Sequence, residues 1–301
     1  MNEMFAAQFN RTRSADQRSF RVTPCAAVIG AMVAFACSAT AQSFFFSTGG
    51  PDGLMAMASR PGTGGSLEIE SADDFLLSTP VSLNQASFTG LLPSGAALSD
   101  VASVSFEIYR VFPNDSTSPP SGNVPTRANS PSDVALGSRD STSGTLTFSA
   151  SVLSSSFTAG NSVLNGINPK PNNTTLGEGP VTGEEVKFNV TFNALDLLAD
   201  HYFFVPQVQL NNGNFYWLSA PKPIVPPGTS INPDLQTWIR NGALDPDWLR
   251  VGTDIIGGGP APTFNASFSL SGTVPDATST AGLLLIAFAG LANCATRLRR
   301  E

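Results

Sequence analysis

The stretch VKFNVTFN, residues 186–193, alternates apolar and polar residues without interruption. Successive side chains of a β-strand point to opposite faces, so its valines and phenylalanines share one face and its polar residues the other. A period of two residues is typical of a strand with one buried face. The stretch therefore predicts a half-buried strand, and VSFEI, residues 104–108, has the same pattern.

A second strand signal contains two apolar runs. HYFFVPQVQL, residues 201–210, and FYWLSAPKPI, residues 215–224, are separated by Asn-Asn-Gly-Asn. This turn composition predicts a β-hairpin. Pro206 lacks an amide hydrogen for the ladder, which predicts an edge position or a bulge for its strand.

The rest of the body has the composition of an all-β protein. Its 27 glycines and 23 prolines interrupt almost every helical window. The helical candidates are residues 234–241 and a turn at 195–200. Further short strands are expected at residues 67–69, 75–77, 85–88, 145–148 and 263–270. Many short strands with Gly/Pro-rich turns predict an antiparallel β-sandwich, jelly-roll-like.

A Pro/Ser-rich segment at residues 113–144 is long for a structureless loop. It is either a functional loop or a linker between two domains. The apolar strand before it needs partners from the chain after it, which favours one β-sandwich domain at residues 42–272.

The first 41 residues resemble an export signal. Four arginines precede an apolar run at residues 26–35, and Ala39-Thr40-Ala41 is a small-residue cleavage pattern. An uncleaved membrane anchor is the alternative, but the run is much shorter than the about 20 residues that span a bilayer. We therefore expect a signal helix that passes the secretion translocon and is cleaved between Ala41 and Gln42.

The chain ends in an apolar segment followed by basic residues. Residues 281–295 would span about 22 Å as a helix, less than the about 30 Å of a hydrocarbon core. Arg297, Arg299 and Arg300 follow, and basic flanks favour the cytoplasmic side. A short C-terminal helix of this kind holds the body outside the membrane, and its marginal length suits a transient sorting signal at residues 273–301.

The order of features in this tail carries a family resemblance. Val274, Pro275 and Asp276, a Ser/Thr spacer, the apolar run and the arginine cluster resemble the PEP-CTERM class of bacterial sorting tails, in its Val-Pro-Asp variant. The resemblance implies cleavage by an exosortase-like membrane enzyme and association with the cell surface and exopolysaccharide. This chain departs from the commonest motif, with Asp276 in place of Glu and Ala277 in place of Pro.

The body has a resemblance of its own. SADDFLL (71–77), FEIYRVFPNDS (106–116) and HYFFVPQVQL (201–210) are among the stretches that resemble a family of bacterial exported proteins without an assigned activity. The resemblance runs through nearly all of residues 67–272. It implies extracellular placement and adds no catalytic residue.

Charge and residue usage exclude several classes of function. The net charge of −7 becomes more negative in the body, because arginines gather in the terminal segments, so nucleic-acid binding is not expected. All three cysteines lie in those segments, at Cys25, Cys37 and Cys294. His201 is the only histidine, which excludes multi-histidine metal sites, and structural pairing is favoured for it over general-base catalysis.

Paired carboxylates are the remaining candidates for chemistry. Adjacent acids in a strand, such as Asp73-Asp74, point to opposite faces and do not converge. Asp245 and Asp247 are two residues apart and Asp254 follows them on a Gly-rich turn, so calcium is a candidate ligand there, as is a sugar stacked on Trp248. The structural alternative is that the aspartates cap turns while Trp248 fills the core.

One aromatic pair hints at sugar binding. Tyr216 and Trp217 are neighbours in a predicted strand, so one of them is expected to be exposed, as in a lectin. The leading functional hypothesis is a non-enzymatic surface or matrix protein, with no required cofactor, that is exported across the inner membrane and associates with exopolysaccharide. The alternatives are a secreted carbohydrate-binding module and a carbohydrate-active enzyme.

Overall fold

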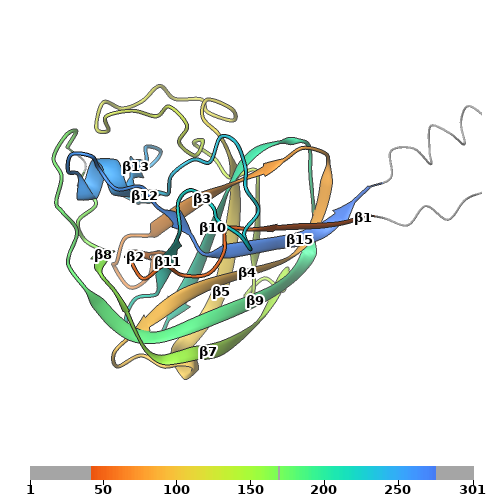
Figure 1. Cartoon of the computed structure of the whole chain (residues 1–301), viewed down its shortest axis with the longest axis horizontal. Helices are drawn as coiled ribbons and strands as arrows, with labels where there is room; N and C mark the ends of the chain where they lie inside the picture. The colour runs from red at the N-terminus through yellow and green to blue at the C-terminus, as the bar shows by residue number, and fades with distance from the viewer. Residues whose placement is uncertain (1–41, 169, 276–301) are drawn as a thin grey trace, which may run out of the picture. The chain divides into compact units, whose positions relative to one another are not determined.

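The computed structural model describes residues 42–168 and 170–275, which form two β-sheets packed face to face (Figure 1). The strands are β1 (Gln42–Ser47), β2 (Met55–Ala58), β3 (Ile69–Leu77), β4 (Val81–Pro93), β5 (Val101–Arg110), β6 (Gly137–Asp140), β7 (Leu146–Ala159), β8 (Asn161–Val163), β9 (Val181–Leu197), β10 (Asp200–Leu210), β11 (Tyr216–Ala220), β12 (Trp238–Asn241), β13 (Leu249–Arg250), β14 (Asn265–Ala266) and β15 (Phe268–Val274). A 3-10 turn, η1 (Leu98–Asp100), and a π-helical turn, η2 (Val251–Ile256), complete the described elements.

The two sheets are almost entirely antiparallel. In the nine-stranded sheet, β4 lies at the centre, with β9 and then β7 on one side and β15, β1, β11, β2, β8 and β14 on the other. The six-stranded sheet has the order β13-β12-β3-β10-β5-β6, and only the β2–β8 pair is parallel. The prediction of an all-β protein with antiparallel sheets is therefore confirmed.

The main core lies between the sheets and is rich in phenylalanine. Phe88 of β4 stacks on Phe188 of β9, with ring centroids 5.0 Å apart, and contacts Phe204 of β10 in the opposite sheet. The apolar positions of both predicted strands, 186–193 and 104–108, are buried, and their polar neighbours are more exposed. The period of two is thus confirmed, because one face of each strand packs on the opposite sheet.

A second, smaller core covers the outer face of the six-stranded sheet. It contains Phe203 and Val205 of β10, Trp238 of β12 and Trp248 from the loop before β13. The Pro/Ser-rich segment contributes to this cover, because its Arg127 is buried and hydrogen-bonds Asp247. The strand before this segment, β5, pairs with β6 at the end of the segment and with β10 from the chain after it, so the predicted need for later partners is confirmed.

The predicted hairpin at residues 201–224 is wrong. β10 belongs to the six-stranded sheet and β11 to the nine-stranded sheet, so the Asn-Asn-Gly-Asn loop carries the chain from one sheet to the other. β10 is also an interior strand, paired with β3 and β5. Pro206 is accommodated because the pairing of β10 with β3 ends at Phe204, before the proline. The edge of β10 at which Pro206 has no N–H to donate faces Ser59, whose hydroxyl donates to the Pro206 carbonyl.

The helix predicted at residues 234–241 is also wrong. Its second half is β12, which pairs with β3 and β13 and is mostly buried. A helix of eight residues is marginal by itself, whereas pairing on both sides satisfies the backbone of Trp238 and Ile239. The expected signal helix and sorting helix lie outside the described residues.

Candidate functional site

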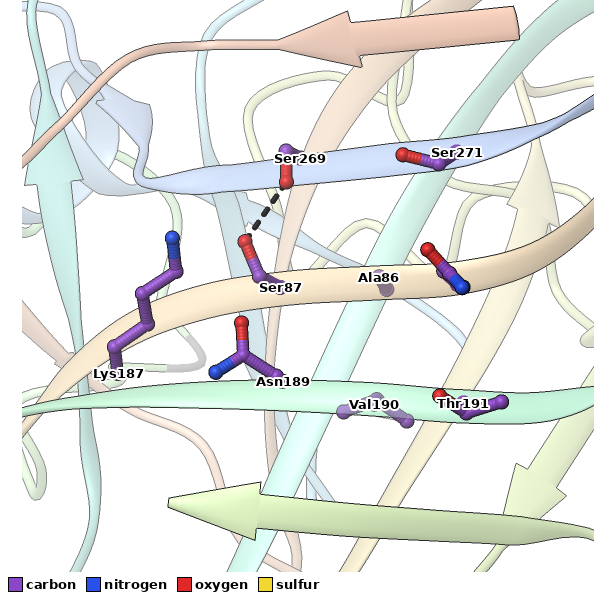
Figure 2. Close-up of a pocket in the computed structure, with 9 residues that line it drawn as sticks. Ala86, Ser87, Lys187, Asn189, Val190, Thr191, Ser269 and Ser271 are labelled. Carbon is purple, nitrogen blue, oxygen red and sulfur yellow. Dashed lines mark hydrogen bonds between the residues drawn. The ribbon is translucent and has the colours of Figure 1, made fainter. Parts of the chain in front are cut away.

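An open polar groove of ≈ 300 Å³ lies on the outer face of the nine-stranded sheet. Three neighbouring strands, β4, β9 and β15, supply its lining (Figure 2). The lining residues are Gln85, Ala86, Ser87, Lys187, Asn189, Val190, Thr191, Ser269 and Ser271. None of them is acidic, and Lys187 is the only charged one.

Strand register aligns these side chains in rows across the sheet. One row runs through directly paired residues Ser47, Ser269, Ser87, Asn189 and Ser149. Figure 2 shows the contact in its middle, where the hydroxyls of Ser87 and Ser269 are 2.8 Å apart. Paired residues point to the same face, so the buried alternation of the core also produces this ordered polar surface.

The next row adds an aromatic side chain. It runs through Phe45, Ser271, Gln85, Thr191 and Thr147. Phe45 is 61% exposed at its end. Hydroxyl and amide groups both donate and accept hydrogen bonds, and an exposed aromatic ring offers a surface for stacking. The face is therefore suited to a neutral ligand rich in hydroxyl groups.

A second pocket, of ≈ 230 Å³, lies over the six-stranded sheet and holds charges that are already paired. Lys222 Nζ is 2.8 Å from Asp234 Oδ1, and Arg250 Nη2 is 2.7 Å from Asp254 Oδ1. The indole N–H of Trp238, another lining residue, is buried without a hydrogen-bond partner. Paired ions of this kind hold loops in place more readily than they perform catalysis.

The three aspartates that were candidates for calcium bind three different arginines. Asp245 Oδ1 is 2.6 Å from Arg240 Nη1, Asp247 Oδ1 is 3.2 Å from Arg127 Nη1, and Asp254 accepts from Arg250. Within the described ranges no cluster of three or more acidic, histidine or cysteine residues has a metal-binding arrangement. Trp248 is fully buried, so it offers no surface on which a sugar could stack.

Asp73 and Asp74 point to opposite faces of β3 and do not converge. Asp73 Oδ2 accepts from the backbone N–H of Ala266 at 2.8 Å, and Asp74 Oδ2 lies 2.6 Å from His201 Nε2. Burial raises the pKa of both carboxyls, and the negative charge of Asp74 adds to the rise at Asp73. Both side chains are inaccessible, which suits structural pairing of His201.

The expectation that Tyr216 or Trp217 is exposed is wrong. Both are buried, and the Trp217 N–H donates to the carbonyl of Ser267 at 2.9 Å. β11 lies between β2 and β4, all five of its residues are buried, and Trp217 packs on Phe204 of the second sheet. The sequence did not predict the groove, because the candidate sites were sought among acidic and aromatic residues. Its signal was the polar half of the alternating strands.

The predicted processing sites meet at one sheet edge. Gln42, the expected first residue of the mature chain, pairs with Val274, the first residue of the sorting motif. Pro275 is exposed. The other predicted residues of these signals, Ala39, Ala41, Asp276, Arg297, Arg299 and Arg300, lie outside the described residues.

The comparisons add no family to this description. No protein-family model matches the chain, and no curated protein matches it significantly. Across residues 42–168 and 170–275, no helix combines the length and apolar character required to cross a membrane.

Proposed function

We propose that this chain is a non-enzymatic surface or matrix protein that is exported across the inner membrane and loses a segment at each end. An exosortase-like enzyme removes the tail, and the remaining jelly-roll-like body associates with exopolysaccharide. The pairing of Gln42 with Val274 carries the proposal. Within the described residues, the strand framework thus begins where signal cleavage is expected and ends where the sorting motif begins.

The position of these ends is favourable for processing. Cleavage before Gln42 leaves all six residues of β1 in place, and cleavage beyond Val274 leaves β15 in place. Gln42 and Pro275 are exposed. A processing enzyme therefore needs no unfolding of the sheet to reach either site, which supports removal of both segments from a folded body.

The first test determines both termini. The protein is purified from its native host, and its ends are determined by intact mass and peptide mapping. We expect it to start near Gln42 and to end near Pro275. The variant Pro275→Ala/Asp276→Ala should retain the tail, whereas Pro119→Ala, at an exposed loop proline, should be processed normally. A wild-type protein that retains residues 281–301 would contradict sorting by tail removal.

The groove supports the second part of the proposal. Its lining is nearly neutral and made of hydroxyl and amide groups, which suits a neutral polysaccharide. The variant Gln85→Ala/Asn189→Ala removes two amides, each worth about 1 kcal/mol in a hydrogen bond. Retention of the protein on immobilised dextran or cellulose should then fall by roughly tenfold or more.

The control for this test is Asn173→Ala, which removes an exposed amide outside the groove. It should bind as the unchanged protein does. Equal losses in the two variants, or no retention of the unchanged protein on either neutral polymer, would exclude the groove as a site for these glycans. Retention on alginate alone would indicate that charge, and hence Lys187, dominates.

A further inference from the structure

β7 is a long, uncharged sheet edge whose first half, Leu146–Val152, pairs without a register irregularity. Its sequence, LTFSASVLSSSFTA, contains neither a charged residue nor proline, and in the described part of the chain it pairs only with β9. Natural proteins usually protect such edges with lysine, proline or a covering loop. Val152 and Leu153 add exposed apolar side chains, 41% and 53% accessible. β7 therefore presents a template for strand addition.

The other edges of the two sheets are less open. β8 has three residues and β13 has two. β6 carries Arg139 and Asp140. β1 is tied to a loop, because the backbone N–H of Thr229 donates to the carbonyl of Ser47 at 2.7 Å. Within the described residues, length and neutrality thus coincide at β7.

Hydrogen-bond direction identifies the free backbone groups. The carbonyl of Thr145 accepts from the N–H of Asn193 in β9. In the regular stretch that follows, the backbone N–H and C=O groups of the odd-numbered residues therefore point toward β9. Backbone groups of successive residues point to alternate sides, so Leu146, Phe148, Ala150 and Val152 direct their N–H and C=O groups away from β9. The first register irregularity follows Val152, which limits the regular stretch to Leu146–Val152.

We propose that β7 pairs with β7 of a second copy of this chain, antiparallel and centred on Ser149. This register is the one that uses the whole regular stretch. Phe148 then exchanges two backbone hydrogen bonds with Ala150 of the second copy, and Leu146 does so with Val152. The two-fold axis makes the interface self-complementary, as in most homodimers.

Side chains favour this occupant as well. Thr147, Ser149 and Ser151 lie on the outer polar face, so Ser149 meets its own copy and Thr147 meets Ser151. Paired hydroxyls are compatible across strands, and no like charges oppose each other. The polar rows of the groove would continue from one copy into the next, which doubles the length of the hydroxyl-rich face.

A cysteine cross-link tests the register. In the full chain with Cys25, Cys37 and Cys294 replaced by serine, Ser149→Cys places two thiols at a non-hydrogen-bonded pair. The Cα atoms there are about 4.5 Å apart, within disulfide range. We expect oxidation to give a dimer on a non-reducing gel that reductant converts to monomer.

Ser151→Cys is the matched control, because it is equally exposed on the same strand face. Its thiols would be four residues out of register, about 13 Å apart, and should remain monomeric. A mixture of Thr147→Cys and Ser151→Cys chains should cross-link. Equal dimer from Ser149→Cys and Ser151→Cys, or folded Ser149→Cys protein that stays monomeric, would overturn the proposal.

Sedimentation velocity provides a second measurement that does not depend on the introduced thiols. The cysteine-free chain in mild detergent should show a dimer that Val152→Lys dissociates, because the lysine places a charge on the shared edge. A monomer at every concentration, or a dimer that Val152→Lys leaves intact, would exclude pairing through β7.

Discussion

Replacing Arg240 with methionine is expected to lower the free energy of unfolding by about 3–5 kcal/mol, because it leaves a buried carboxylate without its counter-charge. Arg240 Nε donates to Glu70, and Nη2 donates to the Tyr109 hydroxyl at 3.0 Å. Its guanidinium lies 4.3 Å from the centre of the Trp248 ring. Both charged side chains are nearly inaccessible to solvent.

The surroundings of Glu70 explain the size of this effect. Burial raises the pKa of Glu70, and the charge and hydrogen bond of Arg240 oppose that rise. Without Arg240 the carboxyl must either remain ionised in a poorly solvated site or take up a proton. Either outcome costs stability, because desolvation of an unpaired carboxylate is expensive.

Urea denaturation measures this loss, and a double variant separates pairing from packing. Arg240→Met/Glu70→Leu removes both charges and should recover much of the lost stability, since apolar replacements of a buried ion pair are often neutral. Arg139→Met removes a half-buried arginine whose hydrogen-bond acceptors among the described residues are backbone carbonyls, and should cost less than about 1 kcal/mol. A loss at Arg240 no larger than that at Arg139 would refute the role of the buried pair.

The second large effect is expected at Asp247. Asp247→Ala should cost about 3 kcal/mol, because it removes the buried carboxylate that lies 3.2 Å from Arg127 Nη1 and leaves Asp133, 3.2 Å from Nη2, as the remaining carboxylate partner. Arg127 is buried and also donates to the carbonyl of Pro131 at 2.9 Å, so it connects the Pro/Ser-rich segment to the rest of the fold. Loosening of this segment should increase its cleavage by proteases.

Asp245→Ala is the matched control in the same Asp-Pro-Asp sequence. Asp245 also binds an arginine, but its side chain is 56% exposed, so the change should cost no more than about 1 kcal/mol. Thermal and urea unfolding of the two variants, together with limited proteolysis, measure the difference. Equal losses would mean that burial does not determine the strength of these pairs.

Calcium binding is tested by the melting temperature. If calcium raised the melting temperature of the unchanged protein but not of these variants, the three aspartates would again be candidate calcium ligands.

Local patterns predicted the strands well and their partners poorly. The alternation at residues 186–193 and 104–108 identified β9 and β5 and their buried faces. The two apolar runs at residues 201–224 were correctly assigned as strands but wrongly paired, because a turn of Asn and Gly says nothing about which sheet receives the next strand. Residues 234–241 failed for the same reason, since β12 depends on its neighbour β3.

The candidate site shows the same division. The sequence predicted a candidate calcium site at Asp245, Asp247 and Asp254, but the structure pairs them with arginines that lie from 4 to 120 residues away in the chain. The groove was unrecognised because its serines and amides come from three strands far apart in the chain. Serines and amides are common on any protein surface. Only the register between paired strands aligns these residues in a row across the sheet.

By itself, the sequence determined the all-β class, the buried face of the clearest strands, and the cysteine-free body between two signal-like ends, because each depends on local period or composition. Tertiary structure alone decided which strands pair, which charges neutralise each other, and that Gln42 lies beside Val274. The physical reason is that backbone hydrogen bonds and ion pairs between distant segments depend on where the chain returns in space. A pattern spanning a few residues carries no record of that position.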